Sequence, residues 1–142
     1  MTTYSELRAS IQKRIDALPL YFAFSDEQFK ETMNKLGLTE NDTDKIFALS
    51  DGGFCLRTDA ELIHRTFDET NAEIQNALKD DDFCVDAIEW ELENHEYCYN
   101  EDAPEEALEA LELCYDDERI KRILKQAKKI YWKRCIEQGW LD

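Results

Sequence analysis

Residues 80–95 read DDDFCVDAIEWELENH, and this stretch decides the fold class. Its apolar side chains recur at the helical period, at Phe83, Cys84, Ala87, Ile88 and Leu92. The aspartates in front of them can cap a helix, because a carboxylate accepts the backbone N–H groups that a first turn leaves free. The stretch therefore predicts a helix from about Phe83 to His95, with an apolar side toward a core and carboxylates on another face.

The same helical period continues on both sides of this helix. It occupies residues 3–18, 25–36, 58–79, 102–112 and 117–138, and most of these segments begin with a residue that favours a helix N-terminus. Pro19 ends the first segment, and Gly37 and Gly139 follow two others as C-terminal caps. The pattern predicts about five to seven helices around one core.

Two short segments interrupt the helical pattern. Residues 20–24 and 54–57 are apolar and aromatic, and we expect them to pair as a two-stranded antiparallel ribbon, because an isolated strand leaves backbone groups unpaired. Residues 46–49 are expected to form one or two helical turns, and residues 51–53 a tight turn. The predicted fold is mostly α, a single helical domain over residues 1–142 with this short ribbon.

Charge is distributed unevenly along the chain. The net charge is −16, from 33 acidic and 17 basic side chains, yet residues 68–118 alone carry 20 acids and a single base, Lys79. The same segment contains Phe83, Trp90 and three tyrosines, whereas disordered acidic tails contain few aromatic residues. We therefore expect the acids to cover one face of folded helices.

The last predicted helix has the opposite charge. Residues 119–142 carry eight bases and two acids. We expect this helix to neutralise part of the acidic region within the same fold. Direct binding of DNA or RNA is the less favoured interpretation, because affinity for nucleic acid depends on neutralising phosphates and the rest of the chain is strongly negative.

Cysteine use and hydropathy bear on the compartment. The five cysteines are scattered and form no C-x-x-C pair, which favours reduced thiols that pack as small core residues. The N-terminus has no basic region followed by an apolar stretch, and the longest apolar run, residues 18–24, is far shorter than a membrane span. These features predict a cytoplasmic protein without membrane contact.

Several segments together carry a family resemblance. They are Pro19 to Ser25, Gln28-Phe29 with Met33 to Leu38, Gly52 to Phe54, Glu91 to Tyr97, Pro104 to Leu108, and Tyr131-Trp132 in the lysine-rich end. Their order and spacing resemble an uncharacterised family of small acidic proteins encoded by phages and mobile elements of gut bacteria, over nearly the whole chain. The resemblance implies no catalytic residue. It implies a phage or mobile-element product that acts in the cytoplasm of a bacterial host cell.

No motif specifies a reaction, a cofactor or a metal site, and we predict no catalytic residue and no enzyme activity. Glu61-x-x-His64 has the spacing of half a di-iron site, but the sequence has no second such pair. His95, at a predicted helix end, is expected to interact with the last carbonyls and with the helix dipole. The enzymatic alternative is a hydrolase that uses His95 with Glu91 or Glu96.

The acidic helices give the most specific functional hypothesis. Carboxylates on successive helical turns lie about 5.4 Å apart along the axis, near the roughly 7 Å between neighbouring phosphates of one nucleic-acid strand. Such a face could occupy the basic groove of a host nucleic-acid-binding protein and inhibit it. The residues expected to contact this protein partner are Glu89, Glu93, Glu96, Glu105, Glu109 and Glu112.

Two other interpretations stay open at this point. The chain could be a structural or assembly factor that self-associates through its apolar and aromatic residues. It could also be a soluble domain whose acidic surface only keeps it in solution. The sequence does not determine the oligomeric state.

Overall fold

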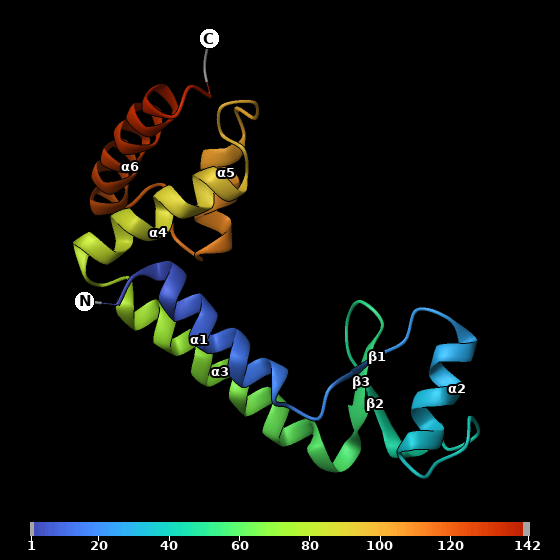
Figure 1. Cartoon of the computed structure of the whole chain (residues 1–142). Helices are drawn as coiled ribbons and strands as arrows, with labels where there is room; N and C mark the ends of the chain where they lie inside the picture. The colour runs from blue at the N-terminus through green and yellow to red at the C-terminus, as the bar shows by residue number, and fades with distance from the viewer. Residues whose placement is uncertain (1, 141–142) are drawn as a thin grey trace. The chain divides into compact units, whose positions relative to one another are not determined.

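The computed structural model describes residues 2–140 (Figure 1). This part of the chain contains six α-helices and a small antiparallel sheet, which confirms the predicted class. The helices are α1 (Tyr4–Asp16), α2 (Asp26–Lys35), α3 (Ala60–Ala77), α4 (Asp81–Asn94), α5 (Ala103–Ala110) and α6 (Glu118–Glu137). The strands are β1 (Tyr21–Phe22), β2 (Ile46–Ala48) and β3 (Gly53–Leu56). Short 3₁₀ turns, Thr43–Lys45 and Arg57–Asp59, precede β2 and α3.

The chain divides into two compact units. We call the residues up to Ser10, together with those from Ala72 onward, the helical unit, and residues Ile11–Asn71 the sheet unit. The division falls within α1 and within α3. The single domain expected from the sequence stays a prediction.

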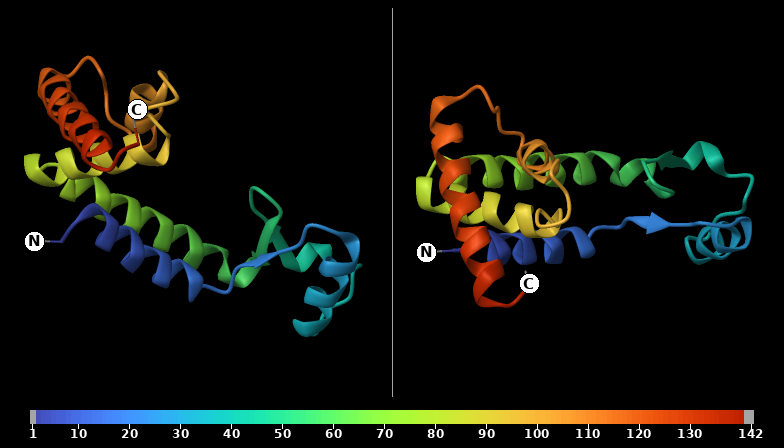
Figure 2. Two further views of the ribbon diagram at one scale, coloured as in Figure 1. Left: turned by 45° about the horizontal axis from the view of Figure 1, so that its top comes forward. Right: turned by 90° about the horizontal axis from the view of Figure 1, so that it is seen from above.

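The helical unit is built around α4, on which α5 and α6 pack (Figure 2). The five apolar residues that predicted α4 are all buried. The side chains that α5 and α6 add to the same core include Ala107, Leu108, Ile120, Ile123, Leu124, Ala127, Tyr131 and Cys135. Burying one large apolar side chain contributes about 1.5–3 kcal/mol, so this cluster is the main source of stability in the helical unit.

The sheet unit contains the predicted ribbon and one further strand. β1 and β3 are antiparallel, with Tyr21 opposite Phe54 and Phe22 opposite Gly53. β2 pairs with the other edge of β3, with Ile46 opposite Leu56 and Ala48 opposite Phe54. The strand order is therefore β1-β3-β2, and the ribbon is a three-stranded sheet.

The expectation of helical turns at residues 46–49 is wrong. Asp51 and Gly52 both have positive φ angles, 57° and 78°, and the Leu49 N–H donates to the Gly53 carbonyl at 2.7 Å. Asp-Gly with two positive φ angles is a hairpin connection, and a hairpin needs a strand on each side. The β-branched and aromatic Ile46 and Phe47 suit a strand in any case.

Gly52 has both an unusual backbone and a close neighbour. Alanine there is expected to destabilise the sheet unit by about 1–2 kcal/mol for the left-handed conformation alone, and further because the added Cβ would lie 3.1 Å from the Ala23 carbonyl oxygen. Gly37→Ala is the matched control, since Gly37 has nearly the same φ, 75°, with nothing within 4 Å of the added Cβ. Chemical denaturation of both variants measures the difference, and equal losses would contradict a role for the close contact.

The cysteines behave mainly as core residues. Cys55, Cys84 and Cys135 are buried free thiols, which confirms the prediction for these three. Burial raises the pKa of the Cys55 and Cys84 thiols. A thiol that stays protonated is a poor nucleophile, so these two side chains serve packing.

Candidate functional site

The six glutamates predicted to contact a partner lie in different environments. Glu89 is only 6% exposed and belongs to the buried side of α4, four residues after Val85 and three before Leu92. The exposed members of the set are Glu93, Glu96, Glu105, Glu109 and Glu112. The burial of Glu89 removes it from any surface that a partner could contact.

Arg134 of α6 neutralises the buried carboxylate. Its Nη2 atom forms ion pairs with Oε1 of Glu89 and Oε2 of Glu93. Burial raises the pKa of Glu89, the charge of Arg134 opposes this rise, and the neighbouring acids Glu93 and Asp86 add to it. Within residues 2–140, Glu89 Oε1 and Arg134 Nε have no hydrogen-bond partner of good geometry. The attraction between the two charges is therefore the main compensation for burying Glu89.

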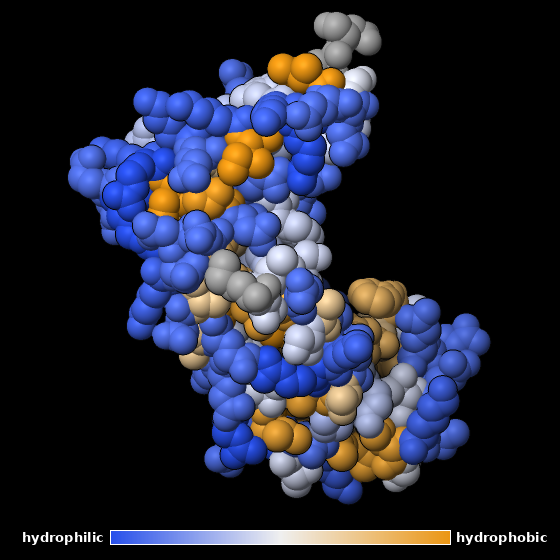
Figure 3. All heavy atoms as spheres, turned by 60° about the vertical axis from the view of Figure 1, so that its left-hand side comes forward, coloured by the Kyte–Doolittle hydropathy of each residue, from blue (hydrophilic) through white to orange (hydrophobic). Residues whose placement is uncertain are grey.

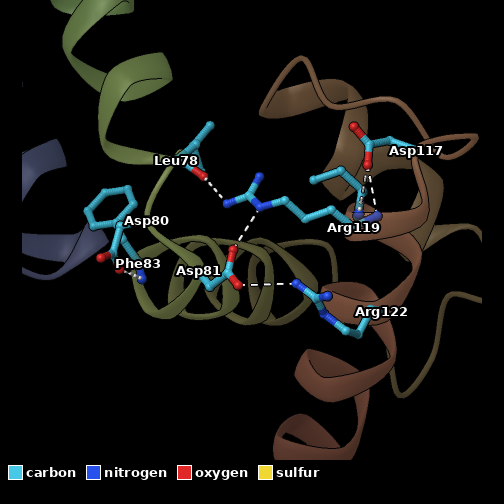
Figure 4. Close-up of polar contacts among 8 residues, drawn as sticks. Leu78, Asp80, Asp81, Phe83, Asp117, Arg119 and Arg122 are labelled. Carbon is cyan, nitrogen blue, oxygen red and sulfur yellow. Dashed lines mark hydrogen bonds and ion pairs between the residues drawn. The ribbon is translucent and has the colours of Figure 1, made fainter.

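A second ion-pair cluster joins α4 and α6 near their N-termini (Figure 4). Arg119 donates from Nε to Oδ1 of Asp81 at 2.7 Å and from Nη2 to the Leu78 carbonyl at 2.7 Å. Arg122 donates to the other oxygen of Asp81 at 3.1 Å. The hydrogen bond from Arg119 is the largest cause of the lowered pKa of Asp81. These contacts confirm that α6 neutralises part of the acidic region within the fold.

Aspartate caps fix the starts of both helices, as Figure 4 also shows. Asp80 accepts the Phe83 N–H at 2.9 Å at the start of α4. Asp117 accepts the Arg119 N–H at 2.8 Å at the start of α6. Each cap of this kind stabilises a helix by about 1 kcal/mol. The carboxylates of Asp80, Asp81 and Asp117 are thus used in folding.

Three carboxylates near α5 are left without such partners. Glu105 and Glu109 lie one turn apart on α5, and Glu101 lies four residues before Glu105, ahead of the helix. None of the three forms an ion pair with the described part of the chain, in contrast to Asp81, Glu89 and Glu93. Their charge is available to another molecule.

These three side chains line one groove between α5 and α6. The groove has a volume of about 480 Å³. Its other lining residues are Pro104, Leu108, Leu113, Tyr115, Leu124 and Lys128. Leu108 and Leu124 are buried core residues, whereas Tyr115 is 60% exposed. The groove therefore combines a negative rim with apolar and aromatic surface.

Apolar side chains also reach the surface elsewhere. Figure 3 shows one face of the molecule, on which hydrophilic residues cover most of the area and hydrophobic residues emerge in small groups. The exposed large hydrophobic residues of the helical unit are Tyr99, Tyr115, Ile130, Ile136 and Trp140. Of these, only Tyr115 lines the groove that also holds Glu101, Glu105 and Glu109.

His95 lies where the sequence placed it. It is the C-terminal cap of α4, and its Nδ1 lies 2.8 Å from the Glu91 carbonyl oxygen. The Glu91 carboxylate itself is buried and accepts the Tyr4 hydroxyl at 2.6 Å. The structure thus places His95 at the helix end with a backbone partner, in the capping position that the sequence favoured.

The Glu61-x-x-His64 motif, which has the spacing of metal ligands, lies in the sheet unit. The His64 ring packs edge-on against Phe47, with ring centroids 5.7 Å apart. In residues 2–140, no three His, Cys, Asp or Glu side chains gather closely enough to hold a metal ion. None of the helices in the same range combines the length and the apolar composition that crossing a bilayer requires.

The groove includes residues that were not predicted as part of a site. Glu101 continues the spacing of Glu105 and Glu109, so its place beside them could have been inferred from the sequence. Leu113 follows Glu109 by the same four residues, and Tyr115 lies two residues further on, both after the end of α5. Lys128 carries no such signal, because it reaches the groove only through the packing of α6 in the helical unit.

Comparison with known proteins gives one match. The sequence model of a family described as a family of unknown function, DUF7659, matches residues 3–133. This agrees with the expected membership in an uncharacterised family, and the match carries no information on origin or activity. No curated protein and no solved structure is detectably similar to the chain.

Proposed function

The chain belongs to the family of unknown function DUF7659, and from the geometry of its helical unit we propose that it is a non-enzymatic protein that binds a basic protein partner. The binding surface comprises the exposed carboxylates that follow α4 and continue along α5. Its predicted members are Glu96, Glu105, Glu109 and Glu112, and we add Glu101, which lines the same groove as Glu105 and Glu109. Glu93 is exposed but already pairs with Arg134, so we leave it out of this surface. Glu89 is not part of this surface because it is buried.

A single observation carries the proposal. Glu101, Glu105 and Glu109 are exposed, line one groove and form no ion pair within the described residues, although Lys128 of α6 lines the same groove. Like charges placed together repel one another and reduce stability unless a partner compensates them. A cationic partner would supply that compensation.

The proposed partner is a host nucleic-acid-binding protein, which the chain would inhibit. Residues four apart on a helix are about 6 Å apart along its axis, so Glu105 and Glu109 on α5 lie at a spacing comparable to that of strand phosphates. The basic groove of such a partner selects regularly spaced negative charge. The sequence resemblance supports a phage or mobile-element origin and a site of action in the cytoplasm of a bacterial cell.

Affinity capture tests this function. The immobilised chain is expected to retain a basic nucleic-acid-binding protein from bacterial lysate at low salt and to release it at high salt, because the screening length falls from about 10 Å at 0.1 M to about 3 Å at 1 M. Duplex DNA should compete for the captured protein. Glu105→Lys/Glu109→Lys should reduce capture roughly tenfold or more, since like charges then face each other.

A matched double variant controls for net charge. Glu27 and Glu31 are exposed, lie four residues apart on α2 and belong to the sheet unit. Glu27→Lys/Glu31→Lys makes the same change in charge, so it should leave most of the capture intact. Equal loss in both double variants, or capture that DNA does not compete for, would contradict nucleic-acid mimicry through this surface.

One observation favours self-association as a second candidate. Phe22 and Phe24 of the sheet unit are 52% and 77% exposed, and their rings are nearly parallel, with centroids 6.4 Å apart. Contiguous exposed apolar surface can mark a protein–protein contact, and these two rings would supply part of such a surface. Recovery of only the chain itself, unchanged by salt and confirmed as an oligomer by sedimentation, would favour this candidate over the binding of a basic partner.

A further inference from the structure

The groove between α5 and α6 differs from the rest of the acidic surface because it also offers apolar contacts. Leu113 is half-buried and Tyr115 is 60% exposed, beside the buried Leu108 and Leu124. Exposed apolar surface costs free energy, which an apolar side chain from a partner would recover. A solvated carboxylate surface without a binding role does not need this combination.

Charge defines what can enter the groove. Three carboxylates, Glu101, Glu105 and Glu109, and one ammonium group, Lys128, line it, so its own charge is negative. Tyr115 can also face a cation, because Lys121 Nζ lies 5.7 Å from the centroid of its ring. Lysine and arginine side chains fit both the negative charge and the apolar surface of the groove, since each has an aliphatic stem and a charged head.

We propose that this groove binds an amphipathic basic segment of the protein partner. Aliphatic side chains of that segment cover Leu113 and Tyr115, and its lysines or arginines pair with Glu105 and Glu109. A volume of about 480 Å³ has room for a few long side chains and not for a folded domain. This inference rests on the proposed function and adds the chemistry by which the partner is recognised.

Two synthetic peptides separate this inference from binding by charge alone. The first is an amphipathic peptide of leucine and lysine, and the second replaces each leucine with glycine at the same charge. Each is titrated into the full chain, with calorimetry for affinity and NMR shifts of backbone amides for location. The leucine–lysine peptide is expected to bind about tenfold more tightly or better, with the largest shifts around residues 101–115.

Variants assign the effect to the groove. Tyr115→Ala should weaken the leucine–lysine peptide about tenfold, as expected for an aromatic contact residue, and Glu105→Gln/Glu109→Gln should weaken both peptides. Glu27→Gln/Glu31→Gln on α2 is the matched control and should change neither affinity. Circular dichroism confirms that the variants fold, which is expected because Tyr115, Glu105 and Glu109 are exposed.

The outcomes distinguish the two proposals. Both peptides could bind with equal affinity that Tyr115→Ala does not change and that high salt abolishes. This result would overturn the groove as the binding site of the basic segment, while a function based on charge alone would still be supported. Absence of binding by either peptide would overturn the groove inference, whereas DNA-competed capture of a basic protein from lysate would still support the proposed function. Equal weakening by the α2 control would also overturn the groove inference.

Discussion

Replacing Arg134 with alanine is expected to lower the free energy of unfolding of the helical unit by about 3 kcal/mol, because it leaves the charge of Glu89 buried without its partner. The Glu89 side chain is 8% exposed and that of Arg134 33%. We expect a value at the low end of the usual free-energy cost of breaking a buried ion pair, because Arg134 is partly solvated. Water can enter the space that its side chain leaves. Urea denaturation followed by far-UV circular dichroism measures the loss.

The double variant Arg134→Ala/Glu89→Gln is the decisive control. Glutamine has nearly the shape of glutamate without its charge, so the double variant should regain most of the stability that Arg134→Ala loses. Glu93 also contacts Arg134 but is exposed, so its own loss of a partner costs little. A double variant as unstable as the single one would show that packing by the arginine stem matters more than charge.

The pH dependence has a definite sign. Burial raises the pKa of Glu89 above its ordinary value of 4.5, so the folded state holds this proton more tightly than the unfolded state does. The stability that this group contributes is therefore fully present below pH 4.5 and is lost as the pH rises through the raised pKa. Removing Arg134 raises that pKa further, so Arg134→Ala should recover stability relative to the double variant as the pH falls through the further raised pKa.

Glu89 also shows where reading the sequence succeeds and where it stops. The apolar period of α4 correctly predicted the helix and its buried residues. Glu89 was predicted to be exposed because of its polarity, although it lies at helical spacing from buried neighbours and is itself buried, as Glu91 is. Glu91 has one local partner, His95, four residues on, whereas Arg134 and Tyr4 come from distant segments. No local pattern indicates those two long-range contacts.

The sheet unit shows the same limit at short range. The pairing of residues 20–24 with 54–57 was predictable, because two apolar segments with free backbone groups have few other partners. β2 was missed because a short apolar run fits a helix turn and a strand equally well. The Asp51-Gly52 turn carried the deciding information, since its conformation joins two antiparallel strands.

In the candidate site, the two glutamates on α5 were predictable from the sequence, whereas the groove beside them was not. The spacing of Glu105 and Glu109 follows directly from helix geometry, so their common exposure could be derived from the sequence. The groove beside them requires Tyr115 and Leu113, which follow α5, and Leu124 and Lys128 of α6. A surface built from separate segments depends on their packing, which composition and periodicity do not specify.

Replacing Tyr4 with alanine is expected to cost about 4 kcal/mol in the free energy of unfolding, because a buried ring is lost from the core of the helical unit. Tyr4 is 2% exposed, and its ring packs edge-on against Phe83 and Trp90 at centroid distances of 6.1 and 5.4 Å. Its hydroxyl donates to Glu91 at 2.6 Å, so the alanine variant also leaves a buried carboxylate with one partner fewer.

Tyr4→Phe separates the hydroxyl from the ring. It should cost about 2 kcal/mol, the usual range for a hydrogen bond to a buried charge, and a double-mutant cycle with Glu91→Gln should show coupling between the two side chains. Burial, followed by the hydrogen bond to Glu91, raises the pKa of Tyr4 from 10 to about 12. Its contribution to stability is therefore present below pH 10 and is lost as the pH rises toward 12. The difference between the native chain and Tyr4→Phe should shrink over that window, and a constant difference would contradict the buried hydrogen bond to Glu91.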